Sequence, residues 1–343
     1  MGKKISYFVS AIIGLHIFSS GALAQTSNAG FSIQVTPSPI VESIEPGVTK
    51  TVELKIRNQN SKPETLKMGL RAFSVKENGD IDLKNDEPQD VKDWVSFANP
   101  VFEIAAGEWF TQKITFAVPK EAGFTYSFAV TISRSAPPQK ETGTTAIEGS
   151  VAVFTLLSTN RADATRKLDL VTFSSKKKVY DYLPAIFSVT LKNGGNTLLK
   201  PTGTVYIQRT SKSDNPIATM TFNASGAYIL PDVTRTISLD WASGFPVHKT
   251  DSTTNKTKLL WNWSDLQHFR FGKYVAKAVV VYNDGQRDIP VEAEISFWVI
   301  PWKMLTVLFL LIALVVTGVV TIVKKAIRVA RKGKHSNNAH SAS

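Results

Sequence analysis

Few side chains in this 343-residue sequence are placed to do covalent chemistry. Apart from the two ends of the chain, the only histidines are His248 and His268, about twenty residues apart. No histidine pair has the spacing of a helical metal site, and no nucleophile elbow is present. A hydrolase would need one of these histidines beside an acid and a hydroxyl in a cleft. We therefore predict a protein that is not an enzyme and that uses no cofactor or metal.

The densest aromatic cluster is the strongest candidate for ligand binding. Exposed aromatic rings can stack on sugars or anchor a protein partner. The candidate binding residues are Trp261, Trp263, Phe269, Arg270 and Phe271. Alternation of Trp261 and Trp263 also places both on one face of a strand, the face that usually packs into a core. For these two tryptophans we favour the core interpretation and keep ligand binding as the alternative.

An acidic stretch over residues 77–87 gathers oxygen ligands of the kind that calcium prefers. Its spacing differs from that of calcium-binding loops, and Asn78-Gly79 is a strong hairpin-turn signal. We interpret the stretch as a solvated turn.

Most of the chain alternates apolar and polar residues in short runs separated by turn residues, which indicates strands. The sequence predicts an all-β ectodomain of two tandem immunoglobulin-like sandwiches, over residues 25–158 and 168–300, joined by a linker at 159–167. Residues 135–150 are predicted as a long loop. The runs 52–58 and 187–193 resemble each other, which is consistent with duplicated modules. The predicted strands are 31–35, 51–57, 66–75, 114–118, 124–132, 151–157, 168–173, 185–191, 203–207, 234–239, 259–263, 274–282 and 291–299.

The two ends of the chain indicate export and membrane anchoring. Residues 1–24 have the charged start, short apolar run and alanines of a secretory signal. Residues 303–323 are long and apolar enough for a transmembrane helix, and a basic tail follows at 324–343. Basic residues beside a span stay in the cytoplasm, so we expect a single-pass cell-membrane protein with its N-terminal ectodomain outside.

The formal net charge of +12 is explained mainly by this topology. The signal carries two of the basic residues and the tail carries six, which leaves about +4 on the rest of the chain. Nucleic-acid binding requires a basic stripe on a folded domain, so we exclude it. An exported chain without a single cysteine favours a bacterial cell envelope.

One segment carries a family resemblance. Residues 45–58 combine a Pro-Gly turn with an alternating strand that ends in Asn58, and the Asn78-Gly79 turn follows. In these features the chain resembles WxL-interacting proteins of the bacterial surface. The resemblance implies a signal peptide, two immunoglobulin-like domains, a C-terminal span and a basic tail.

Two functions follow as hypotheses. The first is a membrane-anchored bacterial surface protein that binds an envelope polymer or another surface protein. The second is an envelope chaperone or assembly factor that acts by strand addition. An unpaired edge strand near Phe31 or Phe124 would favour the second hypothesis, and well-covered edges would favour the first.

Overall fold

The computed structural model describes residues 31–135, 149–159, 161–212, 215–251 and 253–339. Within these residues the chain is mostly β-sheet, followed by one long helix, α1 (Trp302–Ala339). This confirms the all-β prediction with a single C-terminal apolar helix. The predicted signal peptide and most of the predicted loop at 135–150 lie outside the described residues.

Strands β1–β10 form the N-terminal unit, in which two sheets share one core. One sheet has the order β1-β3-β8-β6, and the other has the order β2-β10-β9-β4-β5, with β7 also paired to β4. Buried side chains of both sheets, such as Leu54, Phe116 and Phe128, belong to the same cluster. The strands are β1 (Ile33–Thr36), β2 (Ile40–Ile44), β3 (Thr49–Asn58), β4 (Glu64–Val75), β5 (Ile81–Leu83), β6 (Val95–Phe97), β7 (Val101–Ile104), β8 (Trp109–Ala117), β9 (Thr125–Arg134) and β10 (Ser150–Thr159).

Strands β11–β20 form the C-terminal unit, which has a second core. A three-stranded sheet of order β11-β13-β16 packs with a five-stranded sheet of order β12-β20-β19-β14-β15, and β17 and β18 form a separate hairpin. The strands are β11 (Leu168–Ser175), β12 (Val179–Tyr180), β13 (Ala185–Asn193), β14 (Thr202–Gln208), β15 (Ala218–Phe222), β16 (Thr234–Trp241), β17 (Val247–Thr250), β18 (Thr257–Leu260), β19 (Gly272–Asn283) and β20 (Asp288–Val299).

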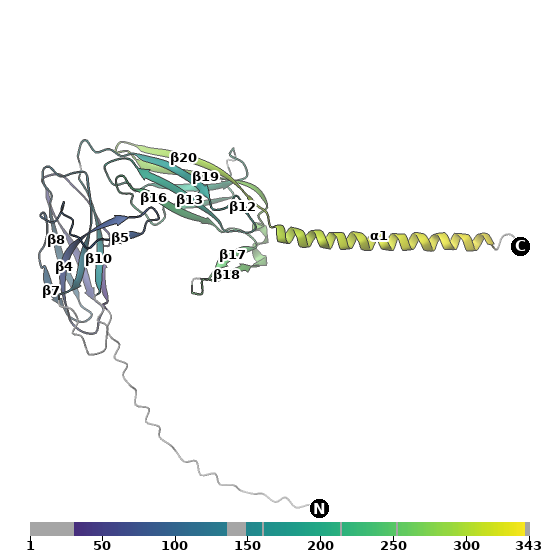
Figure 1. Cartoon of the computed structure of the whole chain (residues 1–343), viewed down its shortest axis with the longest axis horizontal. Helices are drawn as coiled ribbons and strands as arrows, with labels where there is room; N and C mark the ends of the chain where they lie inside the picture. The colour runs from purple at the N-terminus through teal and green to yellow at the C-terminus, as the bar shows by residue number, and fades with distance from the viewer. Residues whose placement is uncertain (1–30, 136–148, 160, 213–214, 252, 340–343) are drawn as a thin grey trace, which may run out of the picture.

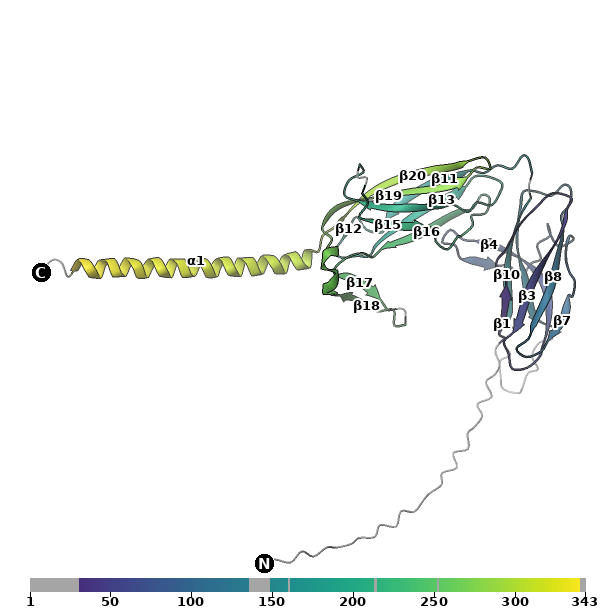
Figure 2. The ribbon, with the colours of Figure 1, turned by 180° about the vertical axis from the view of Figure 1, so that it is seen from behind.

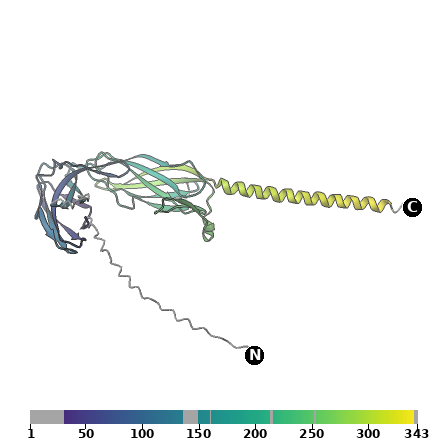
Figure 3. The ribbon, with the colours of Figure 1, turned by 60° about the horizontal axis from the view of Figure 1, so that its bottom comes forward.

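The three parts follow one another in space as they do in sequence. The C-terminal unit lies between the N-terminal unit and α1, which projects from the far end of that unit (Figures 1, 2 and 3). Helix α1 contains one stretch, Trp302–Arg328, that is long and apolar enough to cross a membrane. The helix continues through the predicted basic tail as far as Ala339.

A buried asparagine ends a central strand in each unit. The Asn58 amide donates to the carbonyl oxygens of Lys62 (2.8 Å) and Ile104 (3.1 Å), and Asn193 donates in the same way to Thr197 (2.8 Å) and Ile229 (2.9 Å). Both side chains are completely buried. The similarity of 52–58 to 187–193 therefore reflects the same feature at the end of β3 and of β13, a buried asparagine whose amide bonds to backbone carbonyl oxygens.

Candidate functional site

One strand of the N-terminal unit is covered on only part of its length. Strand β10 pairs with β9 from Ser150 to Ser158. On its other side it pairs in parallel with β2, over Thr155–Thr159 only. Among the described strands, none covers Ser150–Phe154 on that side. This half of β10 therefore presents backbone groups that can pair with another chain.

The uncovered half of β10 arises because the first strand of the unit changes sheets. Strand β1 pairs with β3 in one sheet, and β2 pairs with β10 in the other. The chain crosses between them at Pro37-Ser38-Pro39, where prolines lack the N–H needed to continue a ladder. The four-residue strand β1 is itself a sheet edge near Phe31, as the strand-addition hypothesis requires. Strand β9, which follows Phe124, is paired on both sides.

The side chains on this edge are uncharged. Val153 is fully buried in the core, Val151 and Ala152 are half-buried, and the Phe154 ring packs edge-on against Phe73 with centroids 5.1 Å apart. Residues 150–154 are Ser, Val, Ala, Val and Phe. An uncharged and uncovered strand edge is the type of edge that accepts an added strand.

The other uncovered edge of the same unit is different. Strand β1 covers only Lys55–Asn58 of β3, so Thr49–Leu54 is open on that side among the described strands. This segment carries Lys50 and Glu53, and the Lys50 ammonium lies 2.6 Å from the Glu42 carboxylate. Charges on an edge disfavour pairing with another strand. Within the described residues, charged side chains therefore protect the β3 edge, whereas neither a strand nor a charge protects Ser150–Phe154 of β10.

An ion pair fixes the sheet beside the start of β10. The Arg134 guanidinium on β9 donates two hydrogen bonds to Glu64 on β4, at 2.7 and 2.8 Å, and stacks over the ring of Phe31 at 5.3 Å. Phe31 lies against Gly149, where any Cβ would clash with its side chain. The hydrogen bonds from Arg134 hold the pKa of Glu64 below its ordinary value of 4.5, outweighing the effect of burial.

We expect Glu64→Gln to destabilise the protein in a pH-dependent way. Because the pKa of Glu64 is lower in the folded chain than in the unfolded chain, the pair stabilises the fold at neutral pH. This contribution is lost as the pH falls below about 4.5 and through the folded-state pKa. Melting temperatures should differ most between variant and wild type at neutral pH and converge in acid. A gap that does not change with pH would contradict the assignment.

The structure corrects the core interpretation of Trp261 and Trp263. Trp263 is 69% exposed and Trp261 is also exposed, so neither is a core residue. Strand β18 ends at Leu260, and Trp263 begins a short 3-10 helix, η1 (Trp263–His268). The predicted strand at 259–263 is therefore wrong beyond Leu260, and the two indoles do not share a strand face. The buried tryptophan of this unit is Trp241.

The candidate ligand residues lie in different surroundings. The rings of Trp261 and Trp263 lie 6.0 Å apart and both contact the buried Phe245. Phe269 and Phe271 are exposed. Arg270 turns away from them, donates to the Ser243 carbonyl at 2.9 Å and lies over the Trp241 ring, where burial lowers its pKa.

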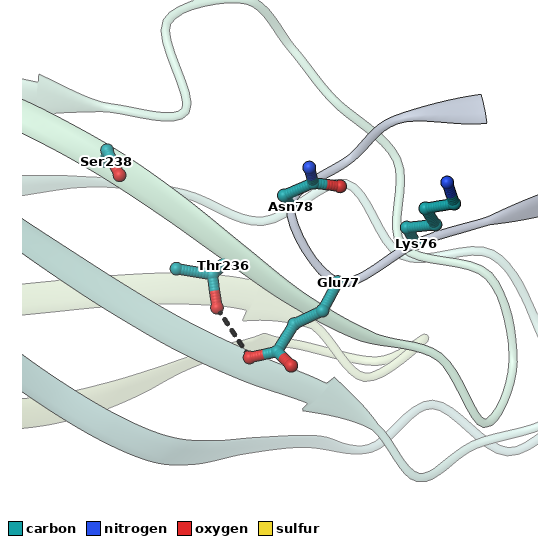
Figure 4. A pocket seen from close by; sticks show the side chains of 5 residues that line it. All are labelled: Lys76, Glu77, Asn78, Thr236 and Ser238. Carbon is teal, nitrogen blue, oxygen red and sulfur yellow. Dashed lines mark hydrogen bonds between the residues drawn. The ribbon is translucent and has the colours of Figure 1, made fainter.

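The acidic stretch forms a hairpin turn that contacts the C-terminal unit. The Glu77 carboxylate accepts a hydrogen bond from the Thr236 hydroxyl at 2.9 Å (Figure 4). The Glu77 carbonyl also accepts one from the Thr236 N–H at 2.7 Å. Gly79 has a φ of +90°, and a Cβ there would meet the Arg235 guanidinium. No group of three metal-ligating side chains occurs among the described residues. The turn joins the two units.

The two histidines belong to different elements, β17 and η1, and have separate surroundings. His248 on β17 packs edge-on against the Tyr182 ring, with centroids 5.6 Å apart. His268 ends η1, with Nδ1 3.9 Å from an Asp265 carboxylate oxygen. In the described part of the chain, neither imidazole is hydrogen-bonded to a serine or threonine hydroxyl.

Comparison with known proteins gives structural likeness only. No family model and no curated protein sequence matches the chain. Among solved structures, the class 5 fimbriae chaperone CfaA matches with 12% identity and a TM-score of 0.39, covering 76% of this chain and 98% of its own. The E. coli chaperone DraB matches with 9% identity and a TM-score of 0.36, covering 77% of this chain and 97% of its own. The Pseudomonas aeruginosa chaperone CupB2 matches with 10% identity and a TM-score of 0.33, covering 78% and 100%. Likenesses of this size do not assign a function to the chain.

Proposed function

We propose that this chain is a membrane-anchored envelope protein that binds an extended segment of another protein as an added strand on β10. The observation that carries the proposal is the uncharged, uncovered edge at Ser150–Phe154. In this proposal the two units are immunoglobulin-like modules held outside the membrane, α1 is the anchor, and the basic residues after it face the cytoplasm.

Strand addition explains how such an edge could bind. The incoming segment would pair with the open backbone groups of β10, each bond contributing about 0.5–1.5 kcal/mol net. Specificity would come from alternate side chains, because successive residues of the added strand face opposite sides of the sheet. The half-buried Ala152 and Phe154 would contact one set of those side chains.

This proposal adopts the assembly-factor hypothesis and keeps part of the surface-protein hypothesis. The part that is kept is binding of another surface protein, and it differs from the assembly-factor hypothesis in whether the bound segment is later released. Polymer binding is not part of the proposal, since a strand edge recognises polypeptide backbone.

A charge placed on the edge should abolish binding. We expect Ala152→Lys to reduce recovery of a bound envelope protein at least about tenfold, since burying an ammonium in the new interface costs more than 1.4 kcal/mol. The full-length protein would be purified in detergent from membranes of the cells that make it, and co-purified proteins quantified by mass spectrometry.

Thr49→Lys is the matched control, because it adds the same charge to the β3 edge that already carries Lys50 and Glu53. It should leave recovery unchanged. Equal melting temperatures for the two variants would show that both are folded. Undiminished recovery with Ala152→Lys would contradict the proposal.

A further inference from the structure

The C-terminal unit has an exposed apolar surface at the end from which α1 emerges. We define the aromatic platform as Leu260, Trp261, Trp263, Leu266 and Phe271, which are all exposed and come from the end of β18, the connection after it, η1 and the residues that follow η1. A contiguous exposed apolar patch usually marks a binding or membrane surface. The platform is not part of the β10 edge, and its function is not explained by strand addition.

A groove lies between helix α1 and the side of the β17–β18 hairpin that carries the platform. A groove of about 520 Å³ has Tyr182, His248, Leu259 and Trp261 on one wall. Helix α1 supplies the other wall, with Lys303 at its start and then Met304, Val307, Leu308 and Leu311. The last four have the i, i+3, i+4, i+7 spacing of a single helix face. These residues belong to the stretch that can cross a membrane, so insertion of that stretch would place the groove where protein, lipid and water meet.

The platform is fixed to the base of the helix by short backbone connections. The Ile300 N–H, just before α1, donates to the Tyr180 carbonyl at 2.7 Å, and the His248 N–H of the hairpin donates to the Leu183 carbonyl at 2.7 Å. The Phe245 N–H donates to the His268 carbonyl at 3.0 Å, which ties the end of η1 to the same body. The hairpin and the start of the helix are therefore attached to one short segment, 180–183. Inserting α1 into a bilayer would place the platform at the bilayer surface.

We propose that the aromatic platform docks on the lipid leaflet that α1 enters on the ectodomain side. The occupant of the groove would be phospholipid, with acyl chains against the α1 face and the indoles of Trp261 and Trp263 at headgroup level. Tryptophan favours this level because its ring is apolar and its N–H can reach water or headgroups. Trp302, the first residue of α1, is 57% exposed and marks the same level.

The docked platform would hold the C-terminal unit at a fixed height and tilt above the membrane. A single helix alone leaves an ectodomain free to rotate and tilt about the point of entry. A second contact beside that point, made by rings rather than by a flexible chain, removes much of this freedom. The hairpin would thus be a second membrane contact of an otherwise single-pass protein.

The absence of cysteine allows a direct test with single spin labels. Leu266→Cys would carry a nitroxide on the platform, and Val101→Cys on β7 is the matched control, because the two side chains are 55% and 56% exposed. Val316→Cys, within α1, reports insertion of the helix. The full-length protein would be reconstituted in vesicles of phosphatidylcholine and phosphatidylglycerol, and collision rates with oxygen and with a polar nickel chelate measured by electron paramagnetic resonance.

We expect the nickel chelate to collide severalfold less often with the label at 266 than with the label at 101, because lipid excludes polar solutes. Oxygen should collide more often with the label at 266 than with the label at 101. The label at 316 should show the strongest exclusion. Equal collision rates at 266 and 101 would overturn the inference, as would a water-like signal at 316. Immobilisation at 266 only after adding cell-wall fragments would also overturn it, in favour of a glycan site.

Discussion

Replacing Trp241 with alanine is expected to lower the free energy of unfolding by about 3–5 kcal/mol. Trp241 is 2% exposed, and its ring contacts Tyr274 and Phe297 with centroids 5.2 and 6.0 Å away. Removing it would leave a cavity at the centre of the C-terminal core. Thermal or denaturant unfolding of the full-length protein in detergent, followed by circular dichroism, would measure the loss.

Trp263→Ala is the matched comparison within the same unit. Because that ring is mostly exposed, we expect a change of less than about 0.5 kcal/mol in detergent. A larger loss for Trp263 than for Trp241 would show that the two tryptophans had been assigned to the wrong environments.

The second large effect is expected at Asn193. In Asn193→Ala, the buried Thr197 carbonyl loses its side-chain donor and the Gly195 N–H loses its acceptor, while the Ile229 carbonyl keeps its bond from the Leu199 N–H. Each buried group left unpaired costs about 1–3 kcal/mol, so we expect a total loss of at least about 2 kcal/mol. The measurement is again the free energy of unfolding.

Asn283 provides the control for this change. Its side chain also accepts from a turn glycine, Gly285, at 2.8 Å and donates to Asp288 at 2.9 Å, but it is exposed. Water can replace those hydrogen bonds, so Asn283→Ala should cost less than about 1 kcal/mol. Equal losses of unfolding free energy at the two positions would mean that burial does not set how strongly the asparagine hydrogen bonds stabilise the fold.

The sequence predicts most of the long strands because alternation is a local property. In β13, Phe187, Val189 and Leu191 are fully buried, as alternation predicts, and β3 follows the same rule. The same rule failed at Trp261 and Trp263, because alternation does not show where a strand ends. The chain leaves β18 after Leu260 and turns into η1 at Trp263, and both rings are exposed.

The β10 edge could not be predicted in the same way. Alternation at 151–157 predicts a strand but not which partner covers it. The partner β2 is only five residues long, and the sequence does not predict it. The other short strands that the sequence does not predict are β5, β6, β7, β12, β15 and β17. That β2 begins only beside Thr155 is a property of tertiary pairing, decided by residues more than a hundred positions apart.

The contact between the two units could not be predicted from the sequence either. The Asn78-Gly79 turn was predicted, and the structure confirms a turn there. Nothing in its sequence indicates that Glu77 would bond to Thr236, which belongs to another unit.

Site-specific photo-crosslinking at Ala152 tests the central claim most directly. A benzophenone amino acid would replace Ala152 in the full-length protein within the cells that make it, with the same replacement at Thr49 as the control. We expect ultraviolet light to join residue 152, but not residue 49, to one envelope protein, with the crosslinks spaced at alternate residues of an extended segment. Labelling of equal strength at both positions, or none at residue 152, would contradict strand addition on β10.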